Sequence, residues 1–351
     1  MSAVLQTIAA PHLVDAAYDF VGSRLDKLGP VPESLRAIVA RACLAGLDSG
    51  QIIEGLHERR VQAPAPALDS HTDPALKADI SSVVRQIEDE GLVRHFRALM
   101  LSFARLTLAT FADPAQAAKA RRWRDEGYTS SFLMTDRGGP AIQNWRTVYN
   151  ETSPGVYKLR IDKEWAMEAT HPGFAFVVAR AENALSPTIF LLSPGVCGAL
   201  KRTPAGPTFL DGTLQLGNVS GAADALAEDR IMKAGPSTIN RLLTSVRPQL
   251  VRALMAQLLW LHRSGGCRLQ PRQLESARSL LAMATTLADQ QTYSIDTVTQ
   301  VMALKFASNS LLVDCVWSGE PATPAIARDL MAFTKMEGSS YRCFKEIYSR
   351  K

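Results

Sequence analysis

The chain has 351 residues, of which 46% are hydrophobic and 21% are charged, a composition typical of globular proteins. Its formal net charge of +5 comes from Lys and Arg residues spread along the sequence, without a dense basic block or zinc-finger spacing. This distribution argues against nucleic acid as a partner. The six histidines also lack ligand spacing, so the sequence predicts no metal site.

Five cysteines lie far apart and form no CxxC pair, which indicates reduced thiols. Met1–Phe20 lacks the basic and apolar regions of an export signal. The longest apolar stretch, Leu250–Leu261, contains Arg252 and is shorter than the roughly 20 residues that cross a bilayer. We therefore expect a cytoplasmic protein without membrane insertion.

Along the chain, helical, strand and again helical patterns follow one another. Apolar residues recur at helical spacing between Val93 and Phe111. From about Thr129 the pattern changes to short β-branched and aromatic runs bounded by Gly, Pro, Asn or Asp, which predicts an antiparallel sheet or barrel. The predicted strands are Ser131–Thr135, Arg146–Tyr149, Val156–Ile161, Phe174–Arg180, Thr188–Leu192 and Thr213–Val219.

Helical spacing returns after about Pro236, in Leu242–His262, Gln273–Gln291 and Ile295–Trp317, with a short helix from Ala325 onward. We therefore expect an α+β fold made of an N-terminal helical domain (1–128), a middle β domain (129–235) and a C-terminal helical bundle (236–351). Such an architecture hosts many functions, so it does not identify a reaction.

Three separated motifs, in the right order, resemble the acyl-CoA dehydrogenase family. Arg328-Asp329 followed by Glu337-Gly338-Ser339 resembles its C-terminal Arg-Asp and Glu-Gly-Thr-Ser motif, and Met302–Ser308 resembles the helix before it. Phe132–Gly139 resembles the loop that opens the family's β domain, and Lys163 with Trp165 fits the following strand.

The resemblance implies that FAD binds between the β domain and the C-terminal helices. It also implies that Glu337 is the base that removes the α proton of an acyl thioester, carried by coenzyme A or by an acyl carrier protein. A carboxylate beside a flavin and an acyl chain is desolvated, which raises its pKa and makes it a better base. A homodimer or homotetramer is also implied; the electron acceptor stays open.

Further site residues follow from the same resemblance. The predicted cofactor contacts are Met134, Thr135, Trp165, Met167, Ser339 and Arg263. The predicted substrate contacts are Ala141, Gly338 and Arg241.

Several positions depart from the family pattern where it holds FAD. Ala166-Met167 replaces Ile-Thr, and Pro140-Ala141 replaces Gly-Ser and so loses a backbone donor. Arg263 lacks the aromatic residue that usually follows it, and the glycine-rich loop is reduced to Ser318–Pro321. Two alternatives therefore stay open: a flavin-free relative that acts on a thioester without redox chemistry, and a non-catalytic binding subunit.

Overall fold

The computed structural model describes residues 11–47, 68–69, 74–139, 141–167, 173–232, 238–290 and 292–348. The chain divides into unit 1, within residues 1–70, 84–92 and 244–351, and unit 2, within residues 71–83 and 93–243. Helices precede and follow a block of strands, which confirms the predicted α+β fold class.

Three helices carry residues of both units: α4 (Pro74–Glu90), α5 (Leu92–Phe111) and α8 (Thr238–Arg263). The other elements of unit 1 are α1 (Pro11–Leu25), α2 (Glu33–Leu47), β1 (Leu68–Asp69), β10 (Cys267–Arg268), α9 (Pro271–Asp289), β11 (Thr292–Tyr293), α10 (Ile295–Ser318), β12 (Glu320–Pro321), α11 (Pro324–Phe333) and α12 (Ser340–Tyr348). Among the described residues, no helix is long and apolar enough to cross a membrane.

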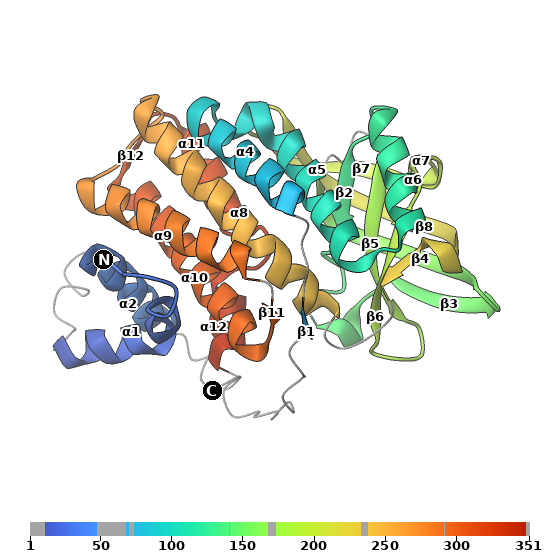
Figure 1. Ribbon diagram of the computed structural model, residues 1–351, viewed down its shortest axis with the longest axis horizontal. Helices are drawn as coiled ribbons and strands as arrows, with labels where there is room; N and C mark the ends of the chain where they lie inside the picture. The colour runs from blue at the N-terminus through green and yellow to red at the C-terminus, as the bar shows by residue number, and fades with distance from the viewer. Residues whose placement is uncertain are drawn as a thin grey trace. The chain divides into compact units, whose positions relative to one another are not determined.

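Helix α10 is the central helix of unit 1. Ser294 caps its start by accepting a hydrogen bond from the Thr297 N–H (3.1 Å), and Gly319 follows its end. Helices α1, α2, α9, α11 and α12 all pack against it, and Figure 1 shows α1 and α2 beside α10 and α12. Almost every residue between Thr297 and Leu312 is consequently buried, including Lys305 and Asn309. These two polar side chains need partners inside the unit.

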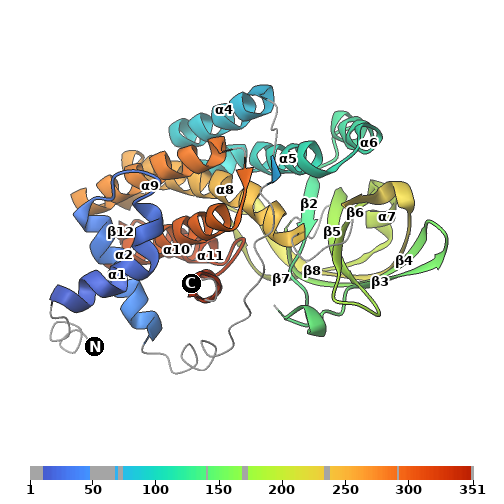
Figure 2. The ribbon, with the colours of Figure 1, turned by 60° about the horizontal axis from the view of Figure 1, so that its bottom comes forward.

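Unit 2 contains α6 (Pro114–Asp125), α7 (Pro194–Ala199) and a mixed sheet. The strands are β2 (Ser130–Leu133), β3 (Val148–Ser153), β4 (Val156–Met167), β5 (Phe174–Ala181), β6 (Pro187–Leu192), β7 (Lys201–Phe209), β8 (Leu214–Leu226) and β9 (Arg230–Met232). Their order is β7-β8-β4-β3-β5-β6-β9, with β2 also paired to β5. Figure 2 shows β3, β4 and β8 curving around β5 and β6, and apolar residues from all five strands share one core.

The sheet differs from the prediction in two respects. Strands β2 and β3 run parallel to β5, whereas a wholly antiparallel sheet was expected. Both reach β5 through long connections, which is what parallel pairing requires. Strand β7 was not predicted, because Pro204, Gly206 and Pro207 mask its pattern. It lies at the edge of the sheet, where proline is tolerated.

A buried ion pair fixes the loop after β2 in unit 2. Asp136 accepts hydrogen bonds from the N–H groups of Gly138 (2.9 Å), Arg146 (2.7 Å) and Thr147 (2.9 Å), and its carboxylate lies 3.5 Å from the Lys163 ammonium. Both side chains of the ion pair are fully buried. Burial lowers the pKa of Lys163 to about 8, although the Asp136 charge opposes this change. The pair therefore anchors residues 136–147 to β4.

We predict that Asp136→Ala lowers the free energy of unfolding by about 3–5 kcal/mol, because it leaves the Lys163 charge buried without its counterion. Lys163→Met should cost less, since Asp136 keeps its three N–H donors. Urea unfolding followed by circular dichroism measures both. Arg268→Gln is the control, because Arg268 and its partner Glu320 are exposed, and a change within about 0.5 kcal/mol is expected. An Asp136→Ala cost no larger than this control would contradict the anchoring role.

Candidate active site

The turn that carries Glu337 has an unusual backbone conformation. It joins α11 to α12 in unit 1, and Glu337 has a φ of +54° while Gly338 has a φ of +124°. Non-glycine residues rarely adopt positive φ, and such strain persists only where the surroundings hold it in place. The predicted base and the glycine after it therefore occupy a turn that needs support from its neighbours.

Three buried side chains provide this support, and each donates to a carbonyl oxygen at the end of α11 or in the turn. Lys305 Nζ lies 3.2 Å from the Phe333 carbonyl oxygen. Arg247 Nε lies 2.6 Å from the carbonyl oxygen of Glu337, and Asn309 Nδ2 lies 3.3 Å from that of Gly338. Lys305 Nζ also donates to Asn309 Oδ1 at 2.6 Å, which connects two of the three donors. The main chain around Glu337 is thus held from α8 and α10.

The same cations set the electrostatics of Glu337. The residue as a whole is partly exposed, but its carboxyl group is withdrawn from water, and this burial raises its pKa above the ordinary value. The charges of Arg247 and Lys305 act in the opposite direction. Burial also lowers the pKa of Lys305 to about 8. Glu337 is therefore a carboxyl group whose proton affinity is raised while two cations favour its ionised form.

Glu337, Gly338 and Ser339 are consecutive residues of the segment that joins α11 to α12. Ser339 immediately precedes helix α12: its carbonyl accepts from the Cys343 N–H (3.0 Å) and its hydroxyl from the Arg342 N–H (3.4 Å). Within the described part of the chain, the Glu337 N–H makes no hydrogen bond. The turn therefore offers a carboxylate and a backbone donor from the same residue.

In unit 2, four predicted site residues lie on neighbouring segments. The Met134 carbonyl accepts from Lys163 Nζ (3.0 Å) and the Thr135 carbonyl from the Glu164 N–H (3.0 Å), so the loop after β2 lies along β4. Trp165 follows at a register shift in β4 with a φ of +57°, and its side chain is 58% exposed. Thr135 is exposed as well, and Met167, two residues beyond Trp165, is partly buried. These segments therefore present the exposed Trp165 ring near the exposed Thr135 hydroxyl.

The other predicted contacts of unit 2 have different surroundings. Ala141 precedes a short 3₁₀ helix, Ile142–Asn144, whereas Pro140 lies outside the described residues. The Arg241 guanidinium lies 5.2 Å from the centre of the Phe111 ring, a cation–π geometry. Nothing in these contacts tests a substrate role, so both positions stay predictions.

Arg263, the predicted phosphate contact in unit 1, is engaged by acidic groups. Its guanidinium lies 3.3 Å from a Glu88 carboxylate oxygen and 4.0 Å from Asp89, and it donates to the Glu88 carbonyl. It also lies 16 residues beyond Arg247 on α8, which corresponds to about 24 Å along a helix. The structure therefore does not bring Arg263 to the Glu337 turn, and its charge is already countered.

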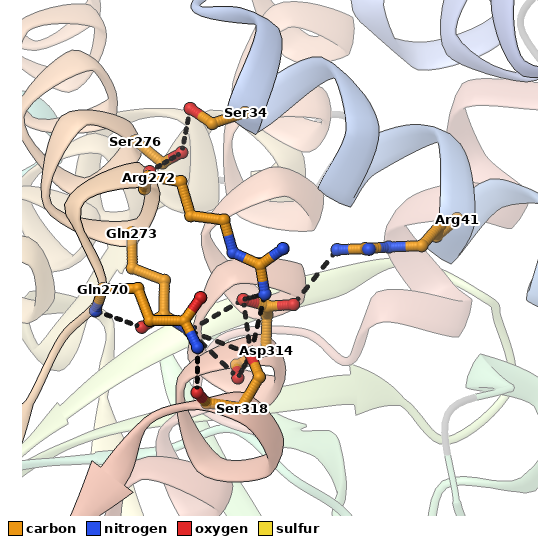
Figure 3. A network of polar contacts seen from close by, with 8 residues as sticks. All are labelled: Ser34, Arg41, Gln270, Arg272, Gln273, Ser276, Asp314 and Ser318. Carbon is orange, nitrogen blue, oxygen red and sulfur yellow. Dashed lines mark hydrogen bonds and ion pairs between the residues drawn. The ribbon is translucent and has the colours of Figure 1, made fainter. Parts of the chain in front are cut away.

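The segment Ser318–Pro321, predicted to replace a glycine-rich loop, begins in a network of hydrogen bonds made by side chains of unit 1. Gln270 donates to the Ser318 carbonyl (2.6 Å), and Asp314 accepts from Gln273 (2.8 Å) and from Arg41 of α2 (3.1 Å). Figure 3 shows Asp314 and Ser318 at the centre of this network, with Arg41 reaching it from the side. Within the described ranges, no group of three or more His, Cys, Asp or Glu side chains could hold a metal ion.

Sequence reasoning missed Arg247 and Asn309 and gave Lys305 no role beyond its motif. The available signal was a basic residue at a buried position: Arg247 lies between Val246 and Leu250 on the apolar face of α8. Sequence alone does not show which backbone carbonyls meet such a residue.

No family model and no curated protein sequence matches the chain. Solved structures match most of it. One is a glutaryl-coenzyme A dehydrogenase in complex with glutaryl-CoA, with a TM-score of 0.62 and 12% identity over 96% of this chain and 94% of that chain. Another is a prolyl acyl carrier protein oxidase, with a TM-score of 0.59 and 12% identity over 96% and 97%.

A third structure is a glutaryl-CoA dehydrogenase from Mycobacterium smegmatis in complex with FADH2, with a TM-score of 0.54 and 12% identity over 86% of this chain and 95% of that chain. These likenesses, at low sequence identity, establish the fold. The chain has the acyl-CoA dehydrogenase fold, as the sequence motifs predicted.

We predict that Gly338→Ala destabilises unit 1 more than an ordinary positive-φ glycine would explain. A Cβ at Gly338 would lie 3.0 Å from Arg247 Nη2, in addition to the strain of the φ of +124°. Gly265→Ala is the matched control, because its φ is +79° but nothing lies within 4 Å of the added carbon. Urea unfolding should show a loss of about 1–3 kcal/mol for the control and a larger loss for Gly338→Ala. Equal losses would mean that Arg247 does not press on the turn.

Proposed function

We propose that this protein is a flavin-dependent oxidoreductase that introduces a double bond between the α and β carbons of an acyl thioester, with Glu337 as the base. The observation that carries the proposal is the Glu337 turn, where a desolvated carboxyl group with a raised pKa lies beside two cations and an unpaired N–H in the described structure. The substrate class is supported by structural neighbours that bind glutaryl-CoA or oxidise an acyl-carrier-protein substrate.

The chemistry suits the groups in the turn. The Glu337 carboxylate takes the α proton, and the electrons of that C–H bond form the new double bond as the β hydrogen leaves with its electron pair. FAD, when bound, supplies the two-electron acceptor. A base works best when its pKa lies near the working pH, and burial moves Glu337 in that direction. The Glu337 N–H can donate to the thioester carbonyl, where negative charge develops as the proton leaves.

The fit of the cofactor differs between its two ends. Trp165 and Thr135 suit the ring end, because an exposed indole offers a stacking face and an exposed hydroxyl offers a hydrogen bond. At the phosphate end the fit is poor, since Glu88 and Asp89 already counter the charge of Arg263. We therefore propose FAD binding through the ring-end residues, weaker than in relatives with a free phosphate-binding arginine.

The ion pairs of Arg263 with Glu88 and Asp89 also favour a second candidate function: proton transfer on an acyl thioester without redox chemistry. In this reaction Glu337 removes the α proton of an unsaturated thioester and delivers it to the γ carbon as the double bond moves, so no electron acceptor is needed. The same turn serves both functions, and the two differ in whether the protein takes up FAD.

FAD titration of the purified protein separates the two functions. We expect a visible flavin spectrum that stays with the protein after gel filtration, and weaker retention in Trp165→Ala, because the stacking face is lost. Leu185→Ala removes another exposed apolar side chain (57% exposed) from unit 2 and should retain FAD as the unchanged protein does. A protein that takes up no FAD would exclude the oxidative function and leave the proton-transfer function.

We predict that Glu337→Gln lowers the rate at which the α protons of butyryl-CoA exchange with D2O by about 100-fold to 10,000-fold, since Gln keeps the size of Glu but accepts no proton. Mass spectrometry of the recovered thioester measures the exchange with or without FAD. Glu320→Gln, an exposed site on unit 1, should leave the rate unchanged. Full exchange activity in Glu337→Gln would remove Glu337 as the base.

A further inference from the structure

The outer face of the sheet in unit 2 carries exposed basic side chains. Side chains alternate along a strand, so Lys158, Arg160 and Asp162 of β4 point away from the buried Leu159 and Ile161. Lys158 and Arg160 are exposed, whereas Asp162 is partly buried. Two cations therefore occupy consecutive outward positions of one strand.

Two arginines of the loop after β2 and a lysine of the edge strand extend this group. Arg137 and Arg146 each lie 3.6 Å from Asp162, one from each carboxylate oxygen, and their side chains are 47% and 63% exposed. Lys201 of β7 is paired with Ser220 of β8, which is paired with Asp162, so Lys201 points to the same face. We call these five cations the basic face: Arg137, Arg146, Lys158, Arg160 and Lys201.

Acidic side chains do not balance the basic face. Asp162 is shared by two of the arginines, Asp224 lies opposite Lys158 on β8, and Glu164 is the next outward position of β4. Five cations therefore face three carboxylates. Within the described residues, Lys158 and Arg160 form no ion pair. The face thus offers exposed positive charge to a partner.

The basic face adjoins the segments that expose two predicted cofactor contacts. Arg137 lies two residues beyond Thr135, and its N–H donates to the Asp162 carbonyl (3.2 Å). On β4, Arg160 precedes Trp165 by five residues, which corresponds to at most about 17 Å along a strand. A ligand that is bound to the basic face can therefore reach the Trp165 ring with an extended arm.

We propose that the basic face docks an acyl carrier protein. Such a carrier is a small acidic protein that holds its acyl group as a thioester at the end of a phosphopantetheine arm. The inference rests on the proposed function and names the carrier of its substrate. Docking places the acidic surface of the carrier on the cations of β4 and β7, while the arm extends toward Trp165 and Thr135.

The extent of the basic face favours a protein over coenzyme A, which has the same arm but ends in one nucleotide. From Lys158 to Asp162 the face extends about 13 Å along β4, and from β4 across β8 to β7 it extends about 10 Å. The phosphates of one nucleotide contact a smaller area. An acidic protein surface can contact all five cations, and complementary charge of this kind speeds association and selects the partner.

The first experiment measures docking without turnover. Binding of purified apo-acyl carrier protein, which lacks the arm, is followed by isothermal titration calorimetry. The double variant Lys158→Glu/Arg160→Glu should bind it roughly 10-fold more weakly or worse, because two attractions become repulsions. The matched control is Arg121→Glu/Arg122→Glu, which makes the same change of charge at exposed positions of α6 and should bind as the unchanged protein does. No binding, or equal affinity in all three proteins, would overturn the proposal.

Salt and competing anions test what the basic face recognises. The affinity should fall as NaCl rises from about 0.01 M to about 1 M, since the Debye length falls from about 30 Å to about 3 Å. Neither free coenzyme A nor vesicles that contain phosphatidylserine should displace the carrier protein. If either one displaces it and itself binds the Lys158→Glu/Arg160→Glu variant more weakly, the face recognises a nucleotide or a membrane surface, and the docking proposal is wrong.

The second experiment compares the two carriers as substrates. Exchange of α protons in D2O is measured with butyryl-acyl carrier protein and with butyryl-CoA, both at low concentration. The ratio of the two rates should fall about 10-fold in Lys158→Glu/Arg160→Glu and stay constant in the α6 control. Lys158→Gln/Arg160→Gln removes the charges without adding repulsion, should lower the ratio less, and decides the question even where the reversed variant does not fold. A constant ratio in both β4 variants would contradict docking at this face.

Failure of the inference and failure of the proposed function give different results. If Glu337→Gln exchanges protons at the full rate with both carriers, Glu337 is not the base and the proposed function fails, although the calorimetry can still show docking at β4. If Glu337→Gln is inactive while the β4 variants bind the carrier as the unchanged protein does, Glu337 remains the base and the basic face is not the docking surface.

Discussion

The buried cations of α8 and α10 are the constraint on which the Glu337 turn depends. Arg247 and Lys305 have little access to water, so their N–H groups require acceptors from within unit 1. Carbonyl oxygens at the end of α11 and in the following turn provide them. A turn whose carbonyls point to the interior leaves its N–H groups to point elsewhere, and this explains why the Glu337 N–H has no partner in the described structure. The contacts that satisfy the two cations are therefore the same contacts that hold the Glu337 turn.

In unit 2, too, a buried lysine holds a segment of the main chain. Lys163 is buried beside Asp136, and its ammonium also donates to the Met134 carbonyl. The lysine therefore determines the path of the loop that carries Thr135, while the β-bulge two residues further on turns Trp165 outward. In both units a candidate site residue with positive φ, Trp165 or Glu337, lies close to a buried lysine. At Glu337, the strain is offset by hydrogen bonds that Arg247 and Lys305 make to carbonyl oxygens of the turn and of the end of α11.

The sequence predicted the helices of unit 1 well, because Ile295–Trp317 and Leu242–His262 carry helical spacing that nearly matches α10 and α8. The order and spacing of the motifs singled out Glu337, but they did not predict the turn in which it lies. Arg247 was beyond reach: it contacts Glu337 across 90 positions of sequence, and no local pattern links a basic residue in an apolar helix to a distant carbonyl. Strand β7 was missed for the opposite reason, because its local pattern of Pro and Gly contradicts its structure.

A flavin enzyme of this kind needs both a base and contacts to the phosphates of its cofactor. In this chain the two candidates, Glu337 and Arg263, have different surroundings. The Glu337 turn is held by side chains of α8 and α10, whereas a phosphate contact at Arg263 would depend on a guanidinium free to meet an anion, about 24 Å further along α8. The ion pair of Arg263 with Glu88 and the hydrogen bond of Arg247 to the Glu337 carbonyl involve different residues of unit 1. The surroundings of Arg263 and those of the Glu337 turn can therefore change independently of one another.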